Sequence, residues 1–264
     1  MALSFRRALV TGAGRRLGQA MALALAEDGL DVAIHYNGSR EGAEATARGV
    51  EGHGRKAALL TADLLDENAV AALIPRAAEA LGVPLDVPIN NASIFEPDDI
   101  ATMTRTSWDR AIESNLRAPV RLTQAFAEQA PKAETDQNGE PVARAVVLHM
   151  LDQRLHAPTP FFQSYTVAKA GLHMHLRTMA QALAPHVRTG AIGPGPTLQG
   201  DRQSAAHFAR QRQGCILGRG ADVEDILAAL RFILGCKAFT GQMLAIDGGQ
   251  HLAWATPDVV GTEP

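Results

Sequence analysis

Short apolar runs alternate with longer stretches of helical periodicity along nearly the whole chain, and this alternation constrains the fold most. The runs lie at residues 8–12, 31–36, 56–63, 86–91, 144–150, 187–193 and 242–247, each bounded by turn-forming residues. Helical stretches lie between most of them, at 17–29, 67–82, 108–129, 164–184 and 223–235. This order predicts an α/β fold: a doubly wound parallel sheet of about seven strands with helices on both faces.

Length and composition favour one folded unit. The chain has 264 residues and 46% hydrophobic content, which predicts a single domain over residues 1–264 with a substantial core. Its net charge of -3, with arginines dispersed among acids, argues against nucleic acid as a partner. No apolar run approaches the ~20 residues of a membrane helix, and the start of the chain enters a glycine loop before a signal-peptide core could form. We therefore expect a soluble, cytoplasmic protein with no membrane partner.

The cysteines and histidines form no recognisable site. Cys215 and Cys236 lack CxxC spacing, so we expect reduced, small, buried residues rather than a disulfide. His173 and His175 stand two residues apart. On a helix they would point to different faces and could not bind one ion together, so no metal site is predicted.

Two segments interrupt the alternation. Residues 131–141 are polar and rich in turn residues, which predicts a surface loop before the fifth strand. Residues 194–215 follow the sixth strand with little core-forming pattern. Because ligands bind beyond the carboxyl ends of parallel strands, a mobile segment over 196–215 is a candidate lid, and a loose surface loop is the equal alternative.

A glycine-rich turn follows the first apolar run. Gly12, Gly14 and Gly18 stand in TGAGRRLG, between a predicted strand and an amphipathic helix. Glycines permit a tight turn, and they let backbone N–H groups and a helix N-terminus meet a pyrophosphate. In this context the motif predicts Rossmann-type dinucleotide binding rather than a simple tight turn.

The second apolar run ends in HYNGSR, where an NAD-binding protein would usually place an acid. No acid lies between Tyr36 and Glu41, whereas Asn37, Ser39 and Arg40 can donate hydrogen bonds to a phosphate, which favours NADPH over NADH. Ser39 could also cap the helix that follows. Asp63, at the end of the third run, would either accept from an adenine amino group or cap the next helix.

Five further features follow the glycine turn in a fixed order: NNAS at 90–93, Asn115 in the following helix, Tyr165-x-x-x-Lys169, PGPTL and TGQMLAIDGG. With them, the chain resembles a short-chain dehydrogenase/reductase from residue 8 to about residue 252. No single motif decides it, but their order and spacing together are highly specific.

Within that family the resemblance is closest to the pteridine reductases, which reduce dihydropterin and folate-type rings with NADPH. TGAGRRLG with Arg16, HYNGSR, Phe95 in NNASIF, and Asp152 where most members have serine carry this likeness. The chain departs from the group in having Gly38, Pro88 in the fourth strand, and Gly190 where asparagine is frequent in the sixth.

The resemblance implies a set of site residues and an assembly. NADPH or NADP+ would be held by Gly12, Gly14, Arg16, Leu17, Gly18, His35, Tyr36, Asn37, Ser39, Arg40, Asp63, Leu64, Asn91, Ala92, Ser93, Pro194, Gly195, Thr197 and Leu198. The pterin or folate-type substrate would contact Arg16, Ser93, Phe95, Asp152, Tyr165, Gly195 and Leu198. The catalytic residues would be Asp152, Tyr165, Lys169 and Asn115, the last as a helix-bending, water-holding residue. A homotetramer through the long helices is implied as well.

Tyr165, Lys169 and Asp152 suggest the chemistry. Tyr165 and Lys169 share a helix face, and an ammonium beside a phenol is predicted to lower the pKa of Tyr165 from about 10 toward working pH. An ionised Asp152 would repel the oxygen of a carbonyl substrate, but it accepts from the N–H and amino groups of a pterin. Phe95 would stack on that flat ring.

The sequence therefore predicts an NADPH-dependent reductase that transfers hydride to a C=N bond of a dihydropterin or of dihydrofolate. Tyr165 would donate the proton, assisted by Asp152 and Lys169. The alternative within the family is a reductase of ketones or acyl-carrier β-keto esters, similar to 3-oxoacyl-carrier-protein reductases, with Asp152 protonated by burial. A third hypothesis is a non-catalytic NADP(H)-sensing protein, which any NADPH turnover would exclude.

Overall fold

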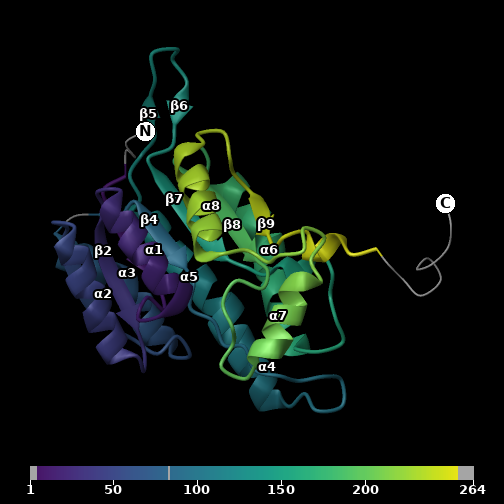
Figure 1. Cartoon of the computed structure of the whole chain (residues 1–264). Coiled ribbons are helices and arrows are strands. Elements are labelled where there is room, and N and C mark those ends of the chain that lie inside the picture. Colours follow the sequence, from purple (N-terminus) through teal and green to yellow (C-terminus); the bar gives the residue numbers. More distant parts are fainter. Residues whose placement is uncertain (1–4, 83, 255–264) are drawn as a thin grey trace.

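The computed structural model describes residues 5–82 and 84–254, and its centre is a parallel sheet of seven strands (Figure 1). The strands are β1 (Arg7–Val10), β2 (Asp31–Tyr36), β3 (Ala57–Thr61), β4 (Val87–Asn90), β7 (Ala145–Met150), β8 (Val187–Pro194) and β9 (Gln242–Ile246). Most of their residues are buried, because both faces of the sheet are covered. Each strand coincides with a predicted apolar run, so the predicted doubly wound sheet is confirmed.

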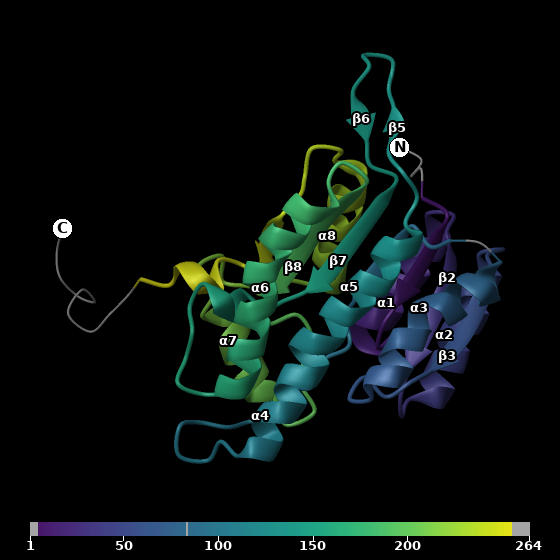
Figure 2. The same ribbon diagram turned by 180° about the vertical axis from the view of Figure 1, so that it is seen from behind.

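Helices cover the sheet in two layers (Figures 1 and 2). One layer holds α1 (Arg16–Glu27), α2 (Arg40–Gly52) and α8 (Val223–Gly235). The other holds α3 (Glu67–Leu81), α4 (Arg105–Ile112), the π-helix η1 (Glu113–Arg117), α5 (Ala118–Gln129) and α6 (Gln163–Leu183). The pleat divides each strand between the layers: Ala8 and Val10 of β1 join the first, and Leu9 joins the second.

The strand order is β3-β2-β1-β4-β7-β8-β9, so the chain reverses direction across the sheet between β1 and β4. Loops that leave the carboxyl ends of these two neighbours diverge, and ligands bind at such a point in open α/β sheets. Pro88 lies in β4 opposite Leu9, although proline lacks the N–H that a central strand donates. The ladder from β4 to β7 accordingly starts only after Pro88, at Ile89 opposite Leu148.

Two residues considered as alternative helix caps, Ser39 and Asp63, do not cap a helix through their side chains. Ser39 is the N-cap residue of α2, but its side chain makes no capping hydrogen bond. Its hydroxyl packs instead on Gly14, where an added Cβ would lie 2.3 Å from Ser39 Oγ. Helix α3 is capped by Asp66, whose carboxylate accepts from two N–H groups of the first turn. Asp63 accepts from the N–H of Leu65 at 3.0 Å.

Residues 131–141, predicted as a loop, contain most of a β-hairpin. Its strands are β5 (Glu134–Thr135) and β6 (Pro141–Val142), which pair antiparallel. Asp136 Oδ1 accepts from the N–H groups of Asn138 at 2.8 Å and Glu140 at 3.0 Å, and these bonds form the turn. The hairpin precedes the amino end of β7 and stands out from the body of the molecule (Figures 1 and 2). It therefore lies away from the carboxyl ends of the strands.

The segment after β8 contains a helix that the sequence pattern did not predict, α7 (Ala205–Gln213). None of its residues is buried, so no apolar periodicity marks it in the sequence. Two 3₁₀ turns complete the fold, η2 (Gln153–Leu155) after β7 and η3 (Gln250–Leu252) after β9.

Other sequence features also have a place in the fold. An added Cβ at Gly190 in β8 would lie 2.8 Å from Ile233 Cγ2 of α8, so the asparagine frequent in relatives has no room here. Cys215 and Cys236 are free thiols; Cys215 is buried, whereas Cys236 is only partly buried. Over residues 5–82 and 84–254, no helix combines the length and apolarity needed to cross a bilayer. The same ranges hold no group of three or more potential ligands placed to bind a metal ion.

Candidate active site

The glycine loop between β1 and α1 is packed so closely that its glycines have no room for side chains. A Cβ on Gly18 would lie 2.3 Å from the carbonyl oxygen of Gly12, which itself has a φ of 66° in the left-handed region. Helix α1 thus begins directly against the loop, and its N-cap residue Arg15 makes no side-chain capping hydrogen bond. First-turn N–H groups without a side-chain cap suit an anion, so this loop fits the pyrophosphate of a dinucleotide.

His35, at the end of β2, is hydrogen-bonded to this loop. Its Nδ1 accepts from the N–H of Gly12 at 3.1 Å, and its Nε2 donates to the carbonyl of Ala62 at 3.2 Å. Burial lowers the pKa of His35 to about 4, so the ring is neutral at physiological pH, as its acceptor role requires. His35 was predicted as a cofactor contact, and its hydrogen bonds show that it positions the glycine loop.

The carboxyl ends of β2 and β3 carry the residues predicted to select NADPH. Tyr36 pairs in register with Thr61, so the segments that begin at Asn37 and at Ala62 leave the sheet side by side. The Arg40 guanidinium is 78% exposed and forms an ion pair of 2.9 Å with Glu44. The positions from 37 to 40 contain no acid. Asp63 is exposed and Leu64 is buried at the end of β3.

Thr11 connects the glycine loop to the segment after β4, and it was not predicted as a site residue. Its hydroxyl oxygen accepts from the N–H groups of Asn91 at 2.9 Å and Ala92 at 3.0 Å, and donates to the carbonyl of Ile89 at 3.3 Å. Asn91 Nδ2 donates in return to the carbonyl of Thr11 at 2.8 Å. A threonine directly before the first glycine was the only signal in the sequence.

Asn115 fixes the segment that contains Ser93. It is fully buried in the π-helix η1, so the predicted irregularity of this long helix is confirmed. Asn115 Oδ1 accepts from Ser93 Oγ at 2.8 Å and from the N–H of Ile94 at 3.1 Å, and Nδ2 donates to the carbonyl of Ile94 at 2.8 Å. Among the described residues no direct hydrogen bond joins Asn115 to Lys169, and the predicted proton relay stays a prediction.

Asp152, Tyr165 and Lys169 come together at the carboxyl end of β7. Tyr165 OH donates to Asp152 Oδ2 at 2.9 Å, and Asp152 Oδ1 accepts from the N–H of Arg154 at 2.8 Å. Lys169 Nζ donates to the carbonyl of Met150 at 2.7 Å and lies 5.7 Å from the centre of the Tyr165 ring. The carboxylate therefore contacts the tyrosine hydroxyl directly, while the lysine lies beside its ring.

The predicted fall of the tyrosine pKa is wrong for this arrangement. Burial raises the pKa of Tyr165 well above its ordinary value, and the Asp152 carboxylate raises it further by its charge and by accepting the phenol proton. Burial also lowers the pKa of Lys169 to about 8, against the opposing effect of Asp152. The sequence showed that Lys169 shares a helix face with Tyr165. It did not show that Asp152 would accept a hydrogen bond from the phenol hydroxyl.

Aromatic rings surround Tyr165. Phe95 lies edge-on to it, with 4.8 Å between ring centroids and 77° between planes. Phe162 stacks on Phe95 at 4.1 Å and 3°, and the Arg154 guanidinium lies 5.1 Å from the Phe162 centroid. Phe162 and Arg154 were not predicted, and only their proximity in sequence to Tyr165 and Asp152 could have indicated them.

Phe162 has a backbone conformation that is rare for a bulky residue, with a φ of 58°. Its N–H donates to the carbonyl of Asp98 at 2.7 Å. The N–H of Ser164 donates to Asp98 Oδ1 at 3.3 Å, and the Ser164 hydroxyl donates to the same carboxylate. Asp98 and Ser164 are buried. These bonds hold the start of α6 against the loop that carries Phe95.

The candidate lid, residues 196–215, lies across the site. Arg16 Nη1 donates to the carbonyl of Gln199 at 2.7 Å and Nη2 to that of Leu198 at 3.2 Å, so the glycine loop holds the start of the lid. Arg202 of the lid donates to the carbonyl of Phe95. These contacts favour the lid interpretation over a loose surface loop, whereas its movement stays a prediction.

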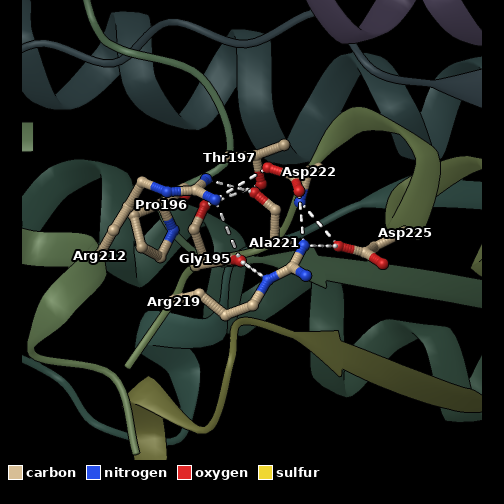
Figure 3. A network of polar contacts seen from close by, with 9 residues as sticks. Gly195, Pro196, Thr197, Arg212, Arg219, Ala221, Asp222 and Asp225 are labelled. Atoms are coloured by element: carbon tan, nitrogen blue, oxygen red, sulfur yellow. Dashed lines mark hydrogen bonds and ion pairs between the residues drawn. The ribbon is translucent and has the colours of Figure 1, made fainter. Parts of the chain in front are cut away.

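The two ends of the lid are joined at the N-terminus of α8 (Figure 3). Arg212 donates to the carbonyls of Pro196 at 3.0 Å and Ala221 at 2.7 Å, and forms an ion pair of 2.8 Å with Asp222. Arg219 pairs with Asp222 and Asp225 on the other side of this network (Figure 3). One guanidinium thus closes the segment into a loop.

Pro194 and Gly195 form the turn that leads from β8 into the lid. The N–H of Gly195 donates to the carbonyl of Ile246 at 2.9 Å, and an added Cβ at Gly195 would lie 2.5 Å from Asp247 Cβ. Thr197 Oγ1 donates to the carbonyl of Gly195 at 3.1 Å. This turn places the predicted contacts after β8 on the same side of the sheet as Asp152, at the carboxyl end of the neighbouring strand β7.

Comparison with known proteins agrees with this geometry. Residues 12–251 match the family model described as "Enoyl-(Acyl carrier protein) reductase". The structure of FolM alternative dihydrofolate reductase 1 from Brucella suis, in complex with NADP, is 37% identical with a TM-score of 0.89, and the match covers 98% of this chain and 100% of that one. Its counterpart from Brucella canis, also with NADP, is 36% identical with a TM-score of 0.87 and the same coverage.

A curated relative carries a different name. The 3-oxoacyl-(acyl-carrier-protein) reductase FabG of Staphylococcus aureus is 29% identical, over 94% of this chain and 98% of that protein. Fold, site and family match agree over nearly the whole chain. The chain therefore belongs to the short-chain dehydrogenase/reductase family.

Proposed function

We propose that this protein is an NADPH-dependent reductase that transfers hydride to a C=N bond of a pterin-type substrate, a dihydropterin or dihydrofolate. The observation that carries the proposal is the 2.9 Å hydrogen bond from Tyr165 OH to Asp152 Oδ2. A carboxylate at this position gives no proton to a carbonyl oxygen, but it accepts from the ring N–H and amino groups of a pterin. The dihydrofolate reductases from Brucella, similar over nearly the whole chain, support the same substrate class.

The residues of the cofactor side fit NADPH. The glycine loop and the uncapped start of α1 would take the pyrophosphate, and the acid-free end of β2 with the exposed Arg40 would take the 2′-phosphate. Asn37 and Ser39 would assist Arg40, and Asp63 would accept from the adenine. When bound, the cofactor supplies the hydride. Relatives crystallised with NADP or NADPH support this choice.

Tyr165 is the proton donor in this proposal. Its raised pKa means that the phenol keeps its proton throughout the working pH range. The hydrogen bond to Asp152 holds the hydroxyl in one orientation, and the substrate nitrogen becomes basic enough to take the proton as hydride arrives. The Lys169 ammonium beside the ring stabilises the negative charge that then remains on the Tyr165–Asp152 pair.

The walls of the site suit a flat heteroaromatic ring. Phe95 is 41% exposed and offers a face for offset stacking on a pterin. Ser93, fixed by Asn115, and the lid residue Leu198, fixed by Arg16, would contact the ring from two sides. Gly195 would allow a close approach of the backbone. A homotetramer through the long helices remains our expectation, and exposed Val167 and Met174 on one face of α6 suit such an interface.

The alternative is a carbonyl reductase of the 3-oxoacyl-carrier-protein type, which the relative from Staphylococcus aureus favours. The two functions differ in what Asp152 must do. A carbonyl oxygen that gains negative charge needs a donor at this position, and a carboxylate disfavours it.

NADPH oxidation by the purified protein, followed by absorbance, tests the proposal. Dihydrobiopterin and dihydrofolate are compared with a panel of ketones and β-keto thioesters, using wild type, Asp152→Asn and Asp152→Ser. We expect turnover of a dihydropterin or dihydrofolate by wild type and a loss of about 10²-fold or more in kcat/KM in both variants. Turnover of ketones alone, or full activity of Asp152→Ser on pterins, would show that the proposal is wrong.

A further inference from the structure

Two arginines from separate segments converge on Phe95. Arg154, in η2, lies with its guanidinium carbon 5.9 Å from the Phe95 centroid and 5.1 Å from that of Phe162. Arg202, from the lid, donates to the Phe95 carbonyl. The first arginine follows β7 and the second follows β8, so the fold alone brings the two cations to this one loop.

Neither guanidinium has a carboxylate partner within residues 5–82 and 84–254. Among the described residues, no Asp or Glu oxygen lies within the 4.0 Å that defines an ion pair from either group. The neighbouring arginines differ: Arg110 pairs with Glu96 at 3.0 Å, and Arg15 pairs with Asp201 at 3.6 Å. Two cations without an ion pair therefore lie beside Phe95, next to the proposed substrate ring.

Arg154 also has donor capacity that the protein does not use. Its Nη1 donates to Thr159 Oγ1 at 2.8 Å, which fixes the side chain across the aromatic stack. Its Nε lies buried without a hydrogen-bond partner in the described part of the chain. The Arg154 guanidinium lies over the aromatic rings, and the N–H groups of a guanidinium match the planar oxygens of a carboxylate.

We propose that Arg154 and Arg202 form a subsite for a carboxylate on the tail of the substrate, so that the protein prefers a folate-type substrate to a dihydropterin with an uncharged side chain. This inference rests on the proposed function. The ring donors of the pterin would go to Asp152, an acceptor, whereas an arginine only donates and needs an acceptor elsewhere on the substrate. Thr159 and Phe161 beside Arg154 are exposed, so a tail that leaves the ring here would reach solvent.

The test compares dihydrofolate with its bis-amide, which keeps the ring and tail but removes both carboxylates. Steady-state KM and kcat are measured for wild type, Arg154→Met, Arg202→Met and the control Arg210→Met. Arg210 is exposed in α7 and has no ion pair in the described part of the chain. Methionine retains much of the arginine stem while removing the charge. Thermal unfolding and NADPH titration establish that each variant is folded.

We expect wild type to favour the acid over the amide by about tenfold in KM, since a hydrogen-bonded charge contributes about that factor. Arg154→Met should raise KM for dihydrofolate about tenfold and Arg202→Met about threefold, with kcat nearly constant and KM for the bis-amide unchanged. The wild-type KM for dihydrofolate should rise with ionic strength, and Arg154→Met should weaken that dependence. Arg210→Met should behave as wild type.

Equal KM values for acid and amide in wild type, or parallel changes of both in Arg154→Met, would overturn the subsite while the proposed function stands. Turnover of neither compound would overturn the proposed function and the subsite with it. If Arg154→Met does not fold, Arg202→Met and the ionic-strength dependence of the wild-type KM decide the question.

Discussion

The two sides of the candidate site are built in opposite ways. On the cofactor side, formed by the loops after β1 to β4, close backbone contacts leave room only for glycine. At Gly18, for example, a Cβ would lie 2.3 Å from the Gly12 carbonyl oxygen. On the substrate side, formed by the loops after β7 and β8, long side chains meet from remote segments, as Arg202 and Phe95 do. The cofactor side thus depends on local spacing, whereas the proposed substrate side depends on tertiary contacts.

The largest effect expected on the substrate side is that of Tyr165→Phe. Removal of the hydroxyl that donates to Asp152 at 2.9 Å takes away the proton donor and should lower kcat by about 10²- to 10⁴-fold. The Kd for NADPH should not change, because the cofactor side is untouched. Stopped-flow and steady-state assays with a dihydropterin, together with a fluorescence titration, measure both quantities. A kcat within tenfold of wild type would contradict the role of Tyr165.

Gly18→Ala is the matching change on the cofactor side. The new Cβ would meet both the Gly12 carbonyl and Asn91 Nδ2, at 2.6 Å, so the loop must shift. We expect the Kd for NADPH to rise at least about tenfold and the free energy of unfolding to fall by about 1–3 kcal/mol. Gly52→Ala is the control, since no atom lies within 4 Å of its added Cβ. If Gly18→Ala and Gly52→Ala had the same Kd for NADPH and the same free energy of unfolding, the close packing at Gly18 would not be what builds the cofactor side.

The pH dependence of kcat should report on Lys169, which lies between the two sides. Its pKa of about 8 means that the ammonium loses its proton as the pH rises through about 8. The charge that stabilises the tyrosinate is then lost, so kcat should fall about tenfold between pH 7 and 9. Lys169→Arg, which keeps its charge in this range, should abolish the inflection even if its activity is lower. A wild-type profile that is flat across this range would contradict the assignment.

The smallest effect is expected for Arg212→Lys at the base of the lid. An ammonium cannot reach the carbonyls of Pro196 and Ala221 together with Asp222, so the ends of the lid separate more readily. The substrate KM should rise about threefold and the free energy of unfolding should fall by about 1–2 kcal/mol, with the Kd for NADPH unchanged. Limited proteolysis between residues 196 and 221 should accelerate. Arg210→Lys on the same helix should change none of these quantities.

The sequence by itself determined the sheet and the glycine turn, and it predicted the residues that we propose as catalytic. Buried parallel strands leave continuous apolar runs, and the spacing of Gly12 and Gly18 reflects a local clash that any side chain would create. Helix α7 was not predicted because none of its residues is buried, so its sequence lacks the apolar periodicity of a helix that packs on the core. The hairpin of β5 and β6 escaped for a similar reason, since its turn is formed by polar side chains.

Only the tertiary structure decided the electrostatics of the candidate site and the side chains that surround Phe95. The pKa of Tyr165 rises instead of falling, because burial and the Asp152 carboxylate act on it together, and neither follows from the helical spacing to Lys169. Arg154 and Phe162 lie close in sequence to Asp152 and Tyr165, but no sequence pattern predicted that they and Arg202 would meet at Phe95. Their roles arise from distances and desolvation, which exist only after the chain has folded and which local periodicity does not encode.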